Sequence, residues 1–263
     1  MKRWQRTIGK WALRGFLLLL LLVALDVTAL ALPYPLFDYK YQSEGFSIYS
    51  SWALPGDVEE IVEWAQARVD AMDYTRPDAG YRVFICGDER LYSVFAFLTR
   101  RSTNSLGIGM TVLGNMYLNE SKIRRFAAGR HGRIPHSRYE GNLSEVVAHE
   151  IVHFNMVKKL GFWRATRMPV WKSEGYAEYQ ANIAATRADG SYVFADRIDL
   201  LTNDAFWGRG ASMARSLFEW HLLVEFLAEE KGFDLEDLAD EAITETFARE
   251  EMLAWYETQR SPR

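Results

Sequence analysis

The most restrictive feature of this sequence is a long apolar segment close to its N-terminus. Residues 15–32 contain six consecutive leucines, Leu17 to Leu22, and are preceded by five basic residues and no acidic one. Such a segment partitions into hydrocarbon, while its cationic flank stays on the cytoplasmic side of the membrane. We therefore predict one N-terminal transmembrane helix within residues 1–32. The remaining residues, 33–263, are expected to form one globular domain outside the cytoplasm.

Two fates of this segment stay open. Its eighteen residues are near the lower limit for a spanning helix, and Asp26 within it costs roughly 2.5–3.5 kcal/mol at mid-membrane. The run Ala29-Leu30-Ala31 also resembles the small-residue site at which signal peptides are cleaved. The chain is thus expected to be a single-pass protein of a bacterial inner membrane with its domain on the periplasmic side, or a cleaved and secreted form.

Charge and cysteine content narrow the classes of function. The formal net charge of -4 argues against a dedicated nucleic-acid-binding protein, so we expect no nucleic-acid partner. The single cysteine, Cys86, excludes a disulfide within the chain and a zinc site made of cysteines. Any bound metal must therefore use histidines and carboxylates. The oligomeric state is left open by the sequence.

The order of strand and helix patterns predicts an α+β fold. Strands are expected at Phe46–Tyr49 and Tyr81–Cys86, followed by a hairpin of residues 108–113 and 116–119 around Gly114-Asn115. Helical spacing is expected over residues 58–69, 91–98, 142–160, 169–187, 212–230 and 235–258. Strands come first and helices later, which predicts a small N-terminal β-sheet packed on a mainly helical C-terminal half.

The sequence His149-Glu150-Ile151-Val152-His153 carries the clearest chemistry in the chain. On a helix, His149 and His153 share one face at a distance that suits a single metal ion. Zinc accepts neutral imidazole nitrogens at ~2.0–2.1 Å. Glu150 lies at the rim of the same face, where its carboxylate can take a proton from a water molecule. This pattern predicts a zinc site with Glu150 as a general base.

A third protein ligand is needed for catalytic zinc, and Glu174 is the best placed candidate. The twenty residues between His153 and Glu174 suffice to end one helix, turn and return on an antiparallel helix. Gly175, beside this ligand, would let the two helices approach closely. Glu178, one turn later, is positioned to accept the free ring N–H of a ligand histidine.

These residues resemble the gluzincins, the metallopeptidases in which an HExxH sequence is followed by a glutamate ligand. The similarity covers residues 142–182, including the segment from Glu174 through Gly175 to Tyr179. It implies a zincin-like fold, zinc bound by His149, His153 and Glu174, Glu150 as base, and Glu178 as the acidic partner of a ligand histidine. The chain lacks the exopeptidase motif of the aminopeptidase branch, so the resemblance does not extend to aminopeptidase activity.

Several other residues are candidates for roles around this site. An oxyanion that develops during peptide hydrolysis needs a donor, and the candidates are Tyr176, Tyr179, Tyr192, Arg215 and His221. Ordinary packing is the alternative for the tyrosines and for His221. The strand Met116–Asn119 could be a sheet edge that binds an extended substrate, or an ordinary hairpin strand. The basic segment 122–138 could be a solvated loop, or a surface for anionic lipid or acidic substrates.

The leading functional hypothesis is a zinc-dependent peptidase that hydrolyses a peptide or protein substrate at the outer face of the membrane. Hydrolysis of another amide, including one in the cell wall, also agrees with the motif. The alternative is a catalytically inactive, membrane-anchored zinc protein that binds a partner through the same cleft.

Overall fold

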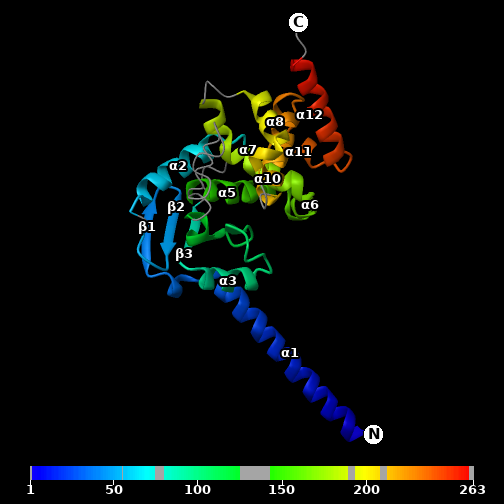
Figure 1. Cartoon of the computed structure of the whole chain (residues 1–263). Coiled ribbons are helices and arrows are strands. Elements are labelled where there is room, and N and C mark those ends of the chain that lie inside the picture. Colours follow the sequence, from blue (N-terminus) through cyan, green and yellow to red (C-terminus); the bar gives the residue numbers. More distant parts are fainter. Residues whose placement is uncertain are drawn as a thin grey trace.

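The computed structural model of the chain has an α+β architecture with one long helix projecting from it (Figure 1). The structure describes residues 2–54, 56–74, 80–124, 143–188, 193–207 and 212–260. A five-stranded mixed sheet comes from the first half of the chain, and the second half is mostly helical. The predicted fold class is confirmed at this level.

The sheet has the strand order β1-β2-β3-β5-β4. Its strands are β1 (Tyr39–Ser43), β2 (Phe46–Ser50), β3 (Tyr81–Cys86), β4 (Gly107–Met110) and β5 (Asn115–Asn119). Strands β2, β3 and β5 run parallel, while β1 and β4 pair antiparallel at the two edges. The helices α2 (Val58–Asp70) and α3 (Glu89–Leu98) lie in the connections that join the parallel strands. Strand β1 was not predicted, because its half-exposed edge position requires no apolar alternation.

The predicted hairpin is present but its turn is longer than expected. Strand β4 ends at Met110, and the turn covers residues 111–114, where the N–H groups of Leu113 and Gly114 both donate to the Met110 carbonyl. Gly114 has a φ of 68°, which explains the glycine at the end of the turn. The proposal that Met116–Asn119 forms a sheet edge was wrong. Strand β5 lies between β3 and β4, and β4 is the edge.

Both faces of the sheet are covered, which is why β3 is apolar from Val83 to Cys86 and β5 is apolar from Met116 to Leu118. On one face, Phe84 and Tyr117 pack with Phe95 of α3 and with Leu30 near the end of α1 (Lys2–Ala31). On the other face, the alternate strand residues, such as Val83, Ile85 and Met116, join the larger core formed with α2, α5 and the C-terminal helices. The sheet is therefore the middle layer of the domain.

The C-terminal half contains more helices than predicted. They are α5 (Leu143–Leu160), α6 (Phe162–Arg167), α7 (Val170–Ala188), α8 (Phe194–Thr202), α9 (Asp204–Trp207), α10 (Ser212–Glu229), α11 (Leu235–Leu238) and α12 (Glu245–Arg260). The single helix expected over residues 235–258 was wrong. Asp234 caps α11 through a capping box, and the Thr244 hydroxyl accepts from the Phe247 N–H at the start of α12. Two helix starts ten residues apart explain the interruption.

Helix α1 contains a stretch from Leu13 to Ala31 that is long and apolar enough to cross a membrane. Its side chains are largely exposed, and the helix points away from the domain (Figure 1). Either a membrane anchor or a signal sequence has these properties.

Gly175 marks a close approach between α7 and α10. A Cβ atom at this position would lie 2.4 Å from the backbone oxygen of Trp220. The expectation that Gly175 accommodates α5 was therefore wrong about the partner, because the neighbouring backbone belongs to α10.

Gly175→Ala is expected to lower the free energy of unfolding by about 1–3 kcal/mol, because a backbone must move to admit the methyl group. Urea unfolding of the full chain in detergent, followed by circular dichroism, measures the change. Gly80→Ala is the matched control, since nothing lies within 4 Å of its added Cβ. Equal stability of the two variants would contradict the close approach.

Candidate metal centre

Helix α5 brings His149 and His153 together on one face. Their Nε2 atoms are 3.2 Å apart. Between the two histidines, Ile151 and Val152 are buried in the main core, so the helix is held by packing on its other side. The local sequence thus combines an apolar face for the core with a polar face for the site.

Glu174 reaches the same point from α7. Its Oε2 lies 3.2 Å from Nε2 of His149, and its Oε1 lies 3.6 Å from Nε2 of His153. Ligand atoms around tetrahedral zinc at ~2.0–2.1 Å are ~3.3 Å from one another. Two imidazole nitrogens and one carboxylate at these separations match the donor set and spacing of a zinc site. Among the described residues, these three form the group that could hold a metal ion.

The Nδ1 atoms of both histidines have other partners, so that both Nε2 atoms face the Glu174 carboxylate. Nδ1 of His149 is 3.2 Å from Oε1 of Glu178, as the sequence predicted for that carboxylate. Nδ1 of His153 is 3.5 Å from the hydroxyl of Ser173, which the sequence did not single out. An N–H on Nδ1 that donates to a carboxylate fixes the tautomer in which Nε2 carries a lone pair.

The local electrostatics favour cation-binding protonation states at two of the three side chains. Burial lowers the pKa of His153 to about 4, so this ring is neutral at physiological pH. Burial opposes ionisation of Glu174, but its hydrogen bond with His149 and nearby positive charges lower its pKa to about 2. Burial opposes protonation of His149 too, yet the hydrogen bonds with Glu174 and Glu178 raise its pKa well above the usual value. The carboxylates of Glu174 and Glu178 therefore favour a positive charge at this position.

Glu150 lies against the edge strand β4. Its side chain is buried, and Cβ atoms added to Gly107 and Gly109 would lie 2.6 and 2.7 Å from its carboxylate oxygens. The two glycines therefore make room for the carboxylate. Burial raises the pKa of Glu150 to about 7, against the opposing effects of His149 and of a hydrogen bond from the Gly109 backbone.

Three residues near the cluster were missed by the sequence reasoning. Gly107 and Gly109 belong to strand β4, where glycine indicates a close approach of another group, and this signal could have revealed them. Arg101, in the connection between α3 and β4, exerts a positive charge on Glu150, His153 and Glu174. No motif around Arg101 identifies it in the sequence.

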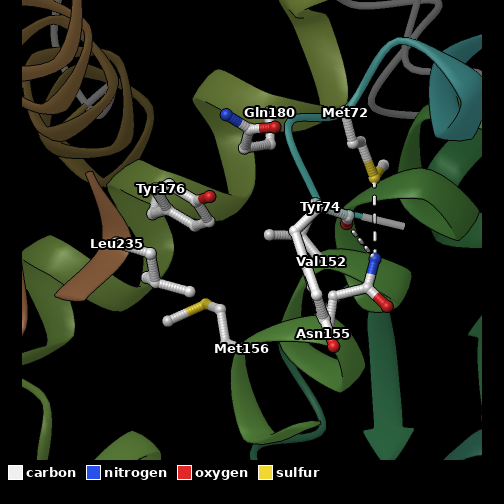
Figure 2. A pocket seen from close by; sticks show the side chains of 8 residues that line it. All are labelled: Met72, Tyr74, Val152, Asn155, Met156, Tyr176, Gln180 and Leu235. Carbon is white, nitrogen blue, oxygen red and sulfur yellow. Dashed lines mark hydrogen bonds between the residues drawn. The ribbon is translucent and has the colours of Figure 1, made fainter. Parts of the chain in front are cut away.

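Three of the proposed oxyanion donors, Tyr176, Tyr179 and Arg215, have side-chain contacts with residues outside the cluster. Tyr176 lines a small cavity with Met72, Tyr74 and Asn155, and none of the three cluster residues is part of its lining (Figure 2). The Tyr179 hydroxyl donates to Glu229 at 2.6 Å. Arg215 pairs with Asp204 at 2.6 Å on the surface. Tyr192 lies outside the described residues.

His221 belongs to a buried charged cluster of α8 and α10. Its Nε2 is 3.3 Å from Oε2 of Glu225, and this oxygen also accepts from Arg197 at 3.0 Å. The cluster is near Glu178 of the candidate metal centre, because His221 and Glu178 affect the pKa of one another electrostatically. The ring of His221 also lies 6.3 Å, between ring centroids, from that of Tyr179 on α7.

The basic segment 122–138 is described only as far as residue 124. Lys122 donates to the Asn104 carbonyl at 2.7 Å, and Arg124 pairs with Glu120 at 2.8 Å. The rest of the segment, including His131 and His136, lies outside the described residues.

Sequence comparison assigns no family to the chain. Neither a scan against protein-family models nor a search of curated proteins gives a match.

Proposed function

We propose that this chain is a zinc-dependent peptidase of the gluzincin type, tethered to a membrane by α1. The observation that carries the proposal is the convergence of His149, His153 and Glu174 at the separations expected of zinc ligands, with Glu150 beside them. The zincin-like character of the fold belongs to the same proposal.

The residues divide the chemistry between them. Zinc, when bound, would polarise the substrate carbonyl and make water more acidic. Glu150 acts as the proton carrier. A pKa of about 7 allows its carboxylate to accept a proton from water and return it to the leaving amine near neutral pH. Glu178 orients His149 through its Nδ1 and keeps the Nε2 lone pair available.

Strand β4 is the proposed substrate-binding edge. One of its sides pairs with β5, and the other borders no strand among the described residues. An extended peptide can add to such an edge by main-chain hydrogen bonds. Because Gly107 and Gly109 of this strand contact the Glu150 carboxylate, an added peptide would pass close to the proposed base.

The zinc content of the purified full chain tests the proposal. We expect about one zinc ion per chain in the wild type, and loss of most of it in His149→Ala, because two protein ligands hold zinc poorly. Elemental analysis after dialysis against a weak chelator measures the content. His131→Ala is the control, since this histidine lies outside the motif. A wild-type chain without zinc, or His149→Ala with full zinc, would refute the metal site.

Gly109→Ala is expected to slow peptide hydrolysis about 100-fold while zinc content stays unchanged, because the methyl group displaces the Glu150 carboxylate by a fraction of an ångström or more. Cleavage of casein and of a mixture of quenched fluorescent peptides measures the rate. Gly80→Ala serves as the control substitution. Undiminished cleavage by Gly109→Ala would show that this contact does not position the base.

A further inference from the structure

The C-terminal end of α1 is built into the core of the domain. The Leu30 carbonyl accepts hydrogen bonds from Asn115 Nδ2 at 2.8 Å and from the Tyr117 hydroxyl at 2.6 Å. Both donors are fully buried in the sheet, and the Leu30 side chain packs on the same core. Cleavage at Ala29-Leu30-Ala31 would disrupt these contacts, and a buried donor without an acceptor costs ~1–3 kcal/mol. These contacts favour an anchor that stays attached to the domain.

The length of the apolar stretch then determines how far the domain lies from the bilayer. The 19 residues from Leu13 to Ala31 form a helix about 28 Å long, which is close to the ~30 Å thickness of a hydrocarbon core. When this stretch fills the bilayer, Ala31 lies at the boundary with the headgroups. Because Leu30 already belongs to the domain core, no spacer separates the domain from the lipid.

The surface around this point exposes several large apolar side chains. Helix α3 packs against α1 and exposes Val94 and Phe97, the latter to 80%. The turn between β4 and β5 exposes Val112 to 77%. This turn adjoins the 3-10 helix η1 (Tyr34–Leu36), because the Arg82 guanidinium donates to both the Tyr34 hydroxyl and the Leu113 carbonyl.

Two further leucines complete this surface, Leu32 after α1 and Leu36 at the end of η1, both about half exposed. The membrane collar, as we name it, consists of Leu32, Leu36, Val94, Phe97 and Val112. Exposed Arg90 and Arg100 flank the α3 part, where long cationic side chains can reach lipid phosphates.

We propose that the membrane collar inserts into the boundary between headgroups and acyl chains, and so fixes the domain against the bilayer. The inference rests on α1 as a retained anchor and is independent of the metal centre. Interfacial segments of this kind bury apolar side chains about 5–10 Å below the headgroups, while cations stay at the surface. The occupant of the apolar surface is thus the same bilayer that α1 spans, rather than a second protein.

Spin labelling of the full chain in vesicles of phosphatidylcholine and phosphatidylglycerol tests this arrangement. Phe97→Cys places the label in the collar, and Phe247→Cys is the matched control on exposed α12, far from α1 (Figure 1). Native Cys86 does not compete for the label, because it is fully buried and burial raises the pKa of its thiol. We expect the label at residue 97 to be severalfold more accessible to oxygen than to a water-soluble nickel complex, and the label at residue 247 to show the reverse.

Three outcomes would overturn the proposal. The first is equal nickel accessibility at residues 97 and 247, and the second is dipolar broadening at residue 97, which would indicate a second copy on the collar. The third is a chain recovered from cell membranes with residues 1–31 removed. Since none of these measurements uses zinc or hydrolysis, a failure of the collar and a failure of the peptidase proposal are distinguishable.

Discussion

Glu150→Gln is expected to lower the rate of peptide hydrolysis by about 10²–10⁴-fold while the zinc content remains that of the wild type. Glutamine preserves the size of the side chain, and its amide oxygen can still accept from the Gly109 backbone. It cannot take up a proton from water near neutral pH, so the proton transfer assigned to the carboxylate is lost. Cleavage of casein and of quenched peptides, together with elemental analysis of the same preparations, gives both quantities.

The control for this experiment is Glu63→Gln, which makes the same chemical change at an exposed position of α2. Cleavage by Glu150→Gln at the wild-type rate would remove this residue from the mechanism. Zinc-loaded wild type and variant that both fail to cleave any peptide would instead favour the inactive, partner-binding alternative. Zinc analysis and cleavage therefore separate the metal site from the reaction.

Arg197→Met is expected to lower the free energy of unfolding by about 3–5 kcal/mol, because it removes the guanidinium that forms an ion pair with the buried Glu225 carboxylate. The guanidinium donates to this carboxylate at 3.0 Å and lies 4.9 Å from the centre of the Phe218 ring. Methionine retains part of the packing volume but none of the charge. Urea unfolding of the full chain in detergent measures the loss.

Arg215→Met is the matched control, since its pair with Asp204 is on the surface and is expected to be worth at most about 1 kcal/mol. The double variant Arg197→Met with Glu225→Leu should recover much of the lost stability, because it removes the buried carboxylate as well. Equal effects of Arg197→Met and Arg215→Met would show that the buried cluster contributes no more than a surface pair.

The parts of the fold that were predicted correctly are those with strong local signals. Strand β3 has an apolar run from Val83 to Cys86, and α5, α7 and α10 are helices of 18 or 19 residues with apolar residues at helical spacing. Edge strand β1 has no such pattern. The break between α11 and α12 depends on two capping residues, Asp234 and Thr244, which compete with an otherwise helical composition.

In the candidate site, too, the features with a local sequence signal were predicted and those that depend on distant segments were not. Histidines four residues apart share a helix face by geometry alone, and the twenty residues before Glu174 permit an antiparallel return. The structure brings these side chains together, whereas the identity of the metal and the reaction stay predictions. Contacts between distant segments, such as Glu150 with Gly109 or Gly175 with Trp220, were beyond local reasoning because they depend on how the layers pack.

Only a few residues separate the end of α1 from the Glu150 carboxylate. The Leu30 carbonyl accepts a hydrogen bond from Asn115, and Asn115 pairs with Met110 of β4. Gly109, which precedes Met110, adjoins the Glu150 carboxylate. One hydrogen bond, one cross-strand pair and one strand residue together span at most about 20 Å. Under the proposed anchoring and the proposed peptidase function, Glu150 therefore lies close to the lipid surface, and the expected substrates are polypeptide segments within a few residues of that surface.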